Sequence, residues 1–178
     1  DRSASRTIGG GKIVDPFSRE RGRARPKRIE LLQAMSQNSV KKALSSLLAK
    51  SGSGIDLVKF SVARNLTMEE TKELVGSLKI KKVGDSSNEW GFSFENWNTL
   101  LGKAIKEVDA FHKRKPETIG MSENEIAKNL DTNLPNFVIK AILNECIGLE
   151  KLKRSGKYIY NTDRFVKISK GDQMNWEK

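Results

Sequence analysis

The feature that most constrains the fold is an order of secondary-structure patterns that occurs twice along the chain. Each copy has helical spacing of apolar residues, then a short extended piece, two further helices and a β-hairpin. The two hairpin turns, at 84–88 and 155–156, lie about 70 residues apart. This order is typical of a winged helix. The sequence therefore predicts a mainly α fold with small β-hairpins (α+β), built from tandem winged-helix domains.

The first copy covers residues 29–94. Apolar positions predict two short helices from residue 28 onward, and the glycines at 52–54 end the second of them. Thr67 is expected to cap the third helix of the unit, because a threonine hydroxyl can accept a free backbone N–H there. A hairpin follows, with strands at 79–83 and 90–94.

The second copy covers residues 95–170. Its helix at 95–112 has the clearest apolar stripe in the chain. Ser122 and Glu125 match a capping box, Pro135 begins another helix, and Gly148 is the expected C-cap. Strands at 149–154 and 157–160 form the second hairpin, and 165–168 is a third extended piece.

The net charge of the chain suggests a polyanionic partner, but the excess of positive charge is not spread evenly along the sequence. The chain has 33 Lys and Arg against 22 Asp and Glu, a formal charge of +11, and residues 1–28 hold +6 of it. The segment 19–28 has no apolar periodicity and is predicted to be a basic linker. Phosphate contact and a merely solvated hinge remain open alternatives for it. Its candidate RNA-backbone residues are Arg19, Arg21, Arg23, Arg25, Lys27 and Arg28.

The third helices of the two units argue against DNA reading. The first, at 68–78, has three glutamates and one lysine, and carboxylates are repelled by phosphates. The second, at 135–147, offers Lys140, Asn136 and Asn144, which we interpret as surface residues. The second wing is more basic. Its candidates for backbone contact are Lys151, Lys153, Arg154 and Lys157; Tyr158 and Tyr160 lie beside them, and we expect at least one tyrosine to be in the core.

No catalytic or metal-binding constellation is evident. His112 and Cys146 are interpreted as structural residues, and the glycines at 9–11 lack the spacing and the Ser or Thr of a phosphate loop. A single cysteine forms no disulfide and suits a reducing compartment. Apolar runs are too short for a membrane span. We therefore expect a cytoplasmic protein that is not an enzyme and has no membrane partner.

Several segments resemble one known family. Residues 1–16, DRSASRTIGGGKIVDP, resemble the end of the third, β-barrel domain of bacterial selenocysteine-specific elongation factors (the SelB family), and 6–11 is similar to the last strand of elongation factor Tu. Further similarity to the first two winged helices of that factor is found at 54–57, 65–67, Trp90, Trp97, Phe111, His112, Pro116, Gly120 and Met121.

The resemblance implies a translation factor that delivers selenocysteinyl-tRNA to the ribosome at UGA codons. The family binds GTP, magnesium and the tRNA through N-terminal domains, and an mRNA hairpin through its C-terminal region. Because the chain opens at Asp1 and lacks the GTPase motifs, we expect a monomeric fragment without a cofactor. By resemblance, the residues near the tRNA T-arm backbone are Arg6, Thr7, Gly9, Gly10 and Gly11.

The domain division that follows is 1–18 as a barrel remnant, 19–28 as linker, 29–94 and 95–170 as winged helices, and 171–178 as a C-terminal tail. The leading hypothesis is a spacer between the tRNA-carrying barrel and the mRNA-reading tip. One alternative is a tandem winged-helix transcription regulator that binds duplex DNA. Another is a protein-interaction module, which an exposed apolar patch would favour.

Overall fold

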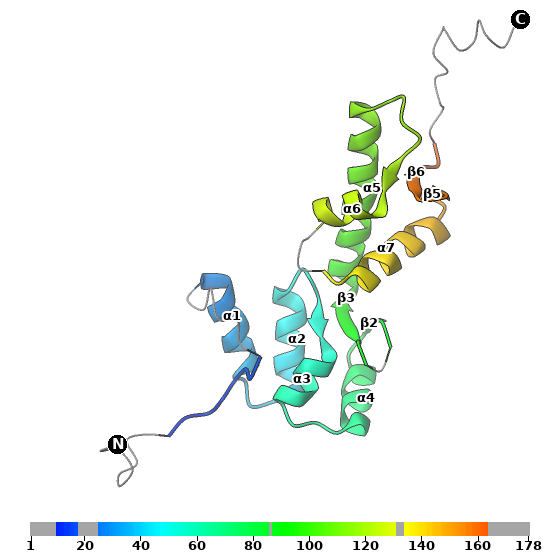
Figure 1. Cartoon of the computed structure of the whole chain (residues 1–178). Helices are drawn as coiled ribbons and strands as arrows, with labels where there is room; N and C mark the ends of the chain where they lie inside the picture. The colour runs from blue at the N-terminus through cyan, green and yellow to red at the C-terminus, as the bar shows by residue number, and fades with distance from the viewer. Residues whose placement is uncertain (1–9, 18–24, 86, 131–133, 164–178) are drawn as a thin grey trace, which may run out of the picture.

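The computed structural model describes residues 10–17, 25–85, 87–130 and 134–163 of the 178-residue chain. In these ranges the chain forms helices and two small antiparallel sheets, and the long helix α5 (Phe94–Arg114) extends from the first hairpin through the second half of the molecule (Figure 1). No helix in the described ranges is both long and apolar enough to cross a bilayer. The fold is the predicted α+β architecture of two successive winged helices.

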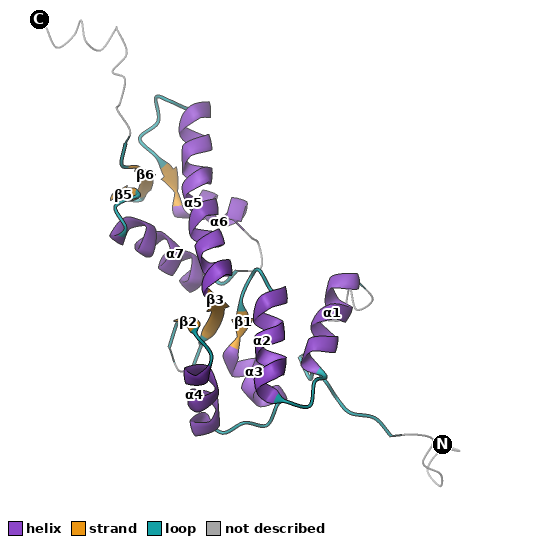
Figure 2. Ribbon diagram, turned by 180° about the vertical axis from the view of Figure 1, so that it is seen from behind, coloured by secondary structure: helices purple, strands orange, loops and turns teal. Residues whose placement is uncertain are grey.

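The first winged helix contains a three-stranded antiparallel sheet of order β1-β3-β2. Its short strand β1 pairs with β3 on one side, and β2 pairs with β3 on the other. One additional helix, α1, precedes the repeated order and lies beside α2 (Figure 2). The elements are α1 (Pro26–Met35), α2 (Val40–Lys50), β1 (Ile55–Asp56), α3 (Leu57–Ala63), α4 (Met68–Ser77), β2 (Ile80–Val83) and β3 (Trp90–Ser93).

The second winged helix has the same topology, with strand order β4-β6-β5. Its first helix is α5, so the long helix is both the connection between the units and a component of the second. After α5 come β4 (Met121–Ser122), α6 (Glu123–Leu130), α7 (Asn136–Gly148), β5 (Leu152–Ser155) and β6 (Tyr158–Asn161). The identical strand orders show that the chain repeats one architecture.

Local caps determine where helices begin. The hydroxyl of Thr67 accepts the backbone N–H of Glu70, and the Glu70 carboxylate accepts the N–H of Thr67 in return. Ser122 and Glu125 form the same reciprocal pair before α6. Each pair satisfies N–H groups that have no partner inside the helix. The predicted Thr67 cap and the predicted capping box at Ser122 are both confirmed.

The hydrophobic core joins the two units. A smaller cluster, with Leu44, Leu57 and Phe60, fills the first winged helix. The larger cluster fills the second, and it also contains Val83 and Phe92 from the first hairpin. The Phe92 ring lies 5.1 Å from the Trp97 ring of α5, centroid to centroid, and both side chains are buried. The first wing is therefore part of the second unit's core.

Gly54 makes room for this arrangement. Its φ is +73°, and a Cβ atom placed there would lie 2.3 Å from Cε1 of Phe92. A side chain at this position would meet both backbone strain and a collision with a buried ring. Gly54, which directly precedes β1, is thus needed for close packing as well as for the turn.

Three predictions about element ends need correction. α1 begins at Pro26, inside the segment 19–28 predicted as linker, because proline is favoured in the first turn of a helix. Phe94 opens α5 instead of ending the hairpin, since Ser93 caps that helix. Gly148 lies within α7, and the left-handed residue beyond the helix is Glu150, with φ of +57°.

The described part of the N-terminal segment lies against the first winged helix. Val14 packs on the smaller core, and the Asp15 carboxylate forms an ion pair with the Arg28 guanidinium of α1. Residues 10–17 form neither helix nor strand. These contacts hold the described end of the segment against the first winged helix.

Candidate nucleic-acid interface

The outer face of the second sheet presents the wing residues predicted to meet RNA. Antiparallel pairing places Lys153 opposite Tyr160 and Ser155 opposite Tyr158. Paired residues share a face of the sheet, and successive residues alternate between faces. Lys153 and both tyrosines therefore lie on one face, with Lys153 exposed and the rings half-buried. Lysine beside an accessible ring suits contact with a sugar-phosphate backbone and a stacked base.

The tyrosines are not core residues, contrary to expectation. Ile159, which lies between them, is fully buried and points to the interior. Leu152 supplies the matching buried position on β5. Successive residues of a strand point to opposite faces of the sheet. Because Ile159 points to the interior, Tyr158 and Tyr160 on either side of it point outward. The correction enlarges the aromatic surface available on this wing.

Arg154 is held by neighbours within the protein. Its guanidinium forms an ion pair with the Glu123 carboxylate of α6 and lies 3.5 Å from the Asn144 side-chain oxygen of α7. Lys157 is more accessible, with its ammonium 5.3 Å from the centre of the Tyr158 ring. Lys151 is exposed at the start of the hairpin. Lys151, Lys153 and Lys157 are thus the better placed candidates of the four.

Only part of the predicted N-terminal site lies in the described residues. Six of the candidates lie outside them: Arg6, Thr7, Gly9, Arg19, Arg21 and Arg23. Four of the described candidates are exposed, namely Gly10, Gly11, Arg25 and Lys27. Arg28 instead forms an ion pair with Asp15. The structure therefore does not bring the described N-terminal candidates together with those of the second wing.

The first wing is electrostatically satisfied by internal partners. Lys81 Nζ lies 2.7 Å from Glu145 of α7 and 5.4 Å from the centre of the Trp97 ring. Lys82 Nζ lies 2.7 Å from the Glu89 carboxylate across the hairpin. These pairs leave the first wing with little free positive charge for a nucleic acid.

Contact with the first wing also covers part of α7, the third helix of the second unit. β2 lies against α7, and a Cβ atom at Gly84 in the hairpin turn would be 3.0 Å from the Phe137 ring. The exposed stripe of α7 consists of Asn136, Lys140 and Asn144. In the first unit, Glu69 and Glu73 of α4 are exposed. Neither helix has the cationic face expected of a DNA reader.

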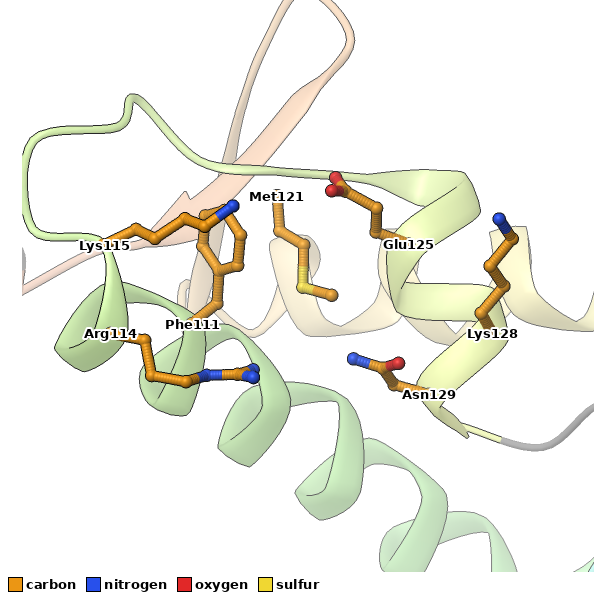
Figure 3. Close-up of a pocket in the computed structure, with 7 residues that line it drawn as sticks. All are labelled: Phe111, Arg114, Lys115, Met121, Glu125, Lys128 and Asn129. Carbon is orange, nitrogen blue, oxygen red and sulfur yellow. The ribbon is translucent and has the colours of Figure 1, made fainter.

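A basic hollow at the C-terminal end of α5 was missed by sequence reasoning. Figure 3 shows Phe111 and Met121 with the side chains of Arg114, Lys115 and Asn129 around them. The hollow measures about 240 Å³, and Lys115 Nζ lies 5.6 Å from the centre of the Phe111 ring. The sequence feature that could have indicated this hollow is the run of three basic residues at 113–115. Only the tertiary structure brings this run beside α6.

The two residues considered for catalysis have structural surroundings. Cys146 is fully buried, its Sγ lies 3.8 Å from the Leu101 carbonyl oxygen, and burial raises its pKa to about 11. His112 Nε2 accepts the backbone N–H of Asn161 at 3.4 Å. In the described ranges, no three His, Cys, Asp or Glu side chains are grouped so that they could hold a metal ion.

Fold and surface together define a tandem winged-helix protein with a basic, tyrosine-bearing second wing. Residues 105–160 match the family model described as Elongation factor SelB, winged helix. The matched range begins within α5 and ends in β6, so it covers most of the second unit. No curated protein matches the chain. The match supports a relation to the SelB translation factors and does not favour a transcription regulator.

Proposed function

We propose that this chain is the winged-helix region of an elongation factor that delivers selenocysteinyl-tRNA to the ribosome at UGA codons. In this proposal it connects the tRNA-carrying barrel with the tip that binds the selenocysteine-insertion hairpin of the mRNA. Support comes from the match over 105–160 and from the resemblance of residues 1–16 to the end of the barrel domain. Through the whole factor, its partners are the tRNA, the mRNA hairpin and the ribosome.

The observation that carries the spacer role is the shared core between the two winged helices. Val83 and Phe92 of the first wing are buried with Trp97 in the second unit's cluster. A spacer must hold its two ends at a fixed separation, and a continuous core resists bending at the junction because packed interiors are dense. The 21 residues of α5 add a length of about 31 Å at 1.5 Å per residue.

In this role the chain is a connector and not an enzyme. GTP and magnesium belong to the N-terminal domains of the parent factor, and we propose that this region binds neither. The region acts as a monomer in the cytoplasm. Its own RNA contacts are weak and involve the backbone, through Lys151, Lys153 and Lys157 of the second wing.

The experiment that tests this function is a titration of the chain with three nucleic acids. These are the selenocysteine-insertion hairpin, an unrelated RNA hairpin and duplex DNA, each at about 50 and 200 mM salt. Weak binding with a steep salt dependence and little sequence preference is expected. Tight binding specific to the insertion hairpin would contradict the spacer role, and tight sequence-specific DNA binding would contradict the translation-factor role.

A further inference from the structure

The basic hollow at the C-terminal end of α5 is lined by three cations from two parts of the chain. Arg114 ends α5, Lys115 follows it directly, and Lys128 lies in the last turn of α6. All three are exposed, and within the described residues none of them forms an ion pair with a carboxylate. Their charge is therefore available to a ligand that enters the hollow.

One carboxylate also lines the hollow, but it belongs to the cap of α6. Glu125 Oε2 accepts the Ser122 hydroxyl at 2.7 Å and the Ser122 backbone N–H at 2.9 Å. The hydroxyl bond, then the backbone bond and the charges of Lys115 and Lys128, hold the pKa of Glu125 below its ordinary value. Three cations against this one carboxylate leave a charge of +2 on the side chains that line the hollow.

Two nearby carboxylates have partners of their own. Glu107 accepts a bond from the Asn129 side-chain amide at 3.2 Å, and Glu123 forms an ion pair with Arg154 of the second wing. Neither Glu107 nor Glu123 is among the described residues that line the hollow. These two acidic residues therefore do not supply its counter-charge.

The form of the hollow indicates the kind of ligand. Arg114 Nε donates to the Ala110 carbonyl at 3.3 Å, and Figure 3 shows the guanidinium directed across the hollow toward Asn129. The buried side chains of Phe111 and Met121 lie at its base. At about 240 Å³ the hollow is smaller than ordinary small-molecule sites, which measure roughly 300–1,000 Å³, so it suits one group of a longer chain.

A phosphate is the group that this set of cations fits best. Arginine forms two parallel hydrogen bonds to a phosphate, and lysine contacts it as a point charge. Phosphate oxygens point in several directions, so cations from α5 and α6 approach the same group from different sides. A carboxylate presents two oxygens in one plane and allows fewer such approaches.

The hollow adjoins the face of the second sheet that bears the tyrosines. Met121 lies in β4, the edge strand that pairs with β6. Its neighbour Ser122 is opposite Tyr158 and therefore shares the outer face of the sheet with that ring. The Ser122 hydroxyl bonds to Glu125 at the rim of the hollow. A ligand chain that contacts Tyr158 thus reaches the hollow by crossing a single edge strand.

We propose that the hollow binds a backbone phosphate of a single-stranded RNA that also lies across the second wing. Arg114, Lys115 and Lys128 contact the phosphate, while bases of neighbouring nucleotides meet the tyrosines of β6. The inference rests on the RNA contacts proposed for the second wing and extends them across β4 to α5 and α6.

The test is an anisotropy titration of the full 178-residue chain with a labelled oligouridine of about 12 nucleotides at several salt concentrations. Arg114→Gln with Lys128→Gln removes two exposed cations of the hollow. The slope of log affinity against log salt should become shallower by about 1.4, which is about 0.7 for each lost contact. Lys128→Gln alone should give about half of this change.

A matched control separates the site from net charge. Lys41→Gln with Lys42→Gln removes the same charge from exposed positions of α2 in the first unit, and it should leave the slope nearly unchanged. Equal changes of slope in the hollow variant and in this control would overturn the proposal, because loss of net charge alone would then explain both.

Two further ligands test the chemical class. A glutamate peptide of the same length should bind at least about tenfold more weakly than the oligouridine. Equally tight binding of this peptide that the hollow variant abolishes would assign the hollow to an acidic protein segment instead. Displacement of the oligouridine by uridine monophosphate at equal phosphate concentration would assign it to a free nucleotide.

Failure of this site is distinguishable from failure of the wing contacts. If Lys153→Glu with Lys157→Glu lowers the slope and Arg114→Gln with Lys128→Gln does not, the wing contacts RNA and the hollow does not. If the natural chain binds no oligouridine at any salt concentration, both sites are contradicted. The spacer role is tested separately, by the preference of the chain among the hairpins.

Discussion

Lys81 Nζ lies 2.7 Å from Glu145 Oε2, and this ion pair links the first wing to the third helix of the second winged helix. Burial raises the pKa of Glu145, but the bond from Lys81, the nearby Trp97 N–H and the Lys81 charge outweigh it, so the pKa is lowered. The Trp97 N–H itself does not reach hydrogen-bond geometry. The pair shows that the two units meet through complementary side chains as well as through the shared core.

Replacing Glu145 by glutamine should alter the pH dependence of stability. A carboxyl whose pKa is lowered by folding stabilises the fold above its ordinary value of 4.5, and this contribution is lost as pH falls through the folded pKa. The natural chain should therefore lose more stability than Glu145→Gln between neutral pH and acid. Urea unfolding of both across this range is the measurement, with the exposed Glu95→Gln as control. Parallel curves for the natural chain and Glu145→Gln would contradict it.

Removal of the Lys81 ammonium should cost little on its own. Both side chains of the pair are about one-third exposed, so Lys81→Ala is expected to lower the free energy of unfolding by about 0.5–1 kcal/mol. Chemical denaturation measures the change. A double-mutant cycle with Glu145→Gln isolates the pair, and a coupling energy near zero would mean that the contact is incidental.

Gly54→Ala should disrupt the junction far more. The new methyl group would collide with the buried Phe92 ring, and the φ of +73° would strain an alanine. We expect a loss of at least about 2 kcal/mol, with the thermal transition broadened or split as the two units uncouple. Gly102→Ala is the control, because its Cβ meets nothing within 4 Å inside α5; it should stabilise the chain by up to about 1 kcal/mol. A Gly54→Ala variant as stable as the natural chain would show that the packing is not as tight as described.

Charge reversal on the second wing should weaken RNA binding. For Lys153→Glu with Lys157→Glu, the slope of log affinity against log salt should fall by about 0.7 for each lost contact with single-stranded RNA. Filter binding or anisotropy at several salt concentrations measures it. Lys41→Glu with Lys42→Glu, on exposed positions of α2, is the matched control. Equal losses in the two variants would mean that only net charge matters.

Cys146 should resist alkylation in the folded chain. Burial raises its pKa to about 11, so at about pH 8 the thiol is protonated as well as inaccessible. Iodoacetamide labelling followed by mass spectrometry should show no reaction in the native state and complete reaction in urea. Rapid native labelling would indicate that α7 opens readily.

Much of the fold could be predicted because its signals are local. Thr67, Ser122 and Glu125 bond to backbone groups within three residues, so their capping roles can be read from neighbours in the sequence. The apolar stripe of α5 likewise depends only on helical periodicity. Whether Tyr158 and Tyr160 point to the core or to solvent was harder to predict. Alternation along a strand allows either face, and only the packing of Ile159 in the core decides which face is buried.

The sequence by itself determined two winged helices, the order of their elements and the scarcity of cations on the first unit's third helix. Only the tertiary structure decided that Phe92 enters the second unit's core, that Lys81 meets Glu145, and that Val62 and Met68 stay in water. The physical reason is the distance along the chain over which each interaction acts. Caps and periodicity act over three or four residues, whereas these contacts join residues far apart in the chain and depend on how the packed units fit together.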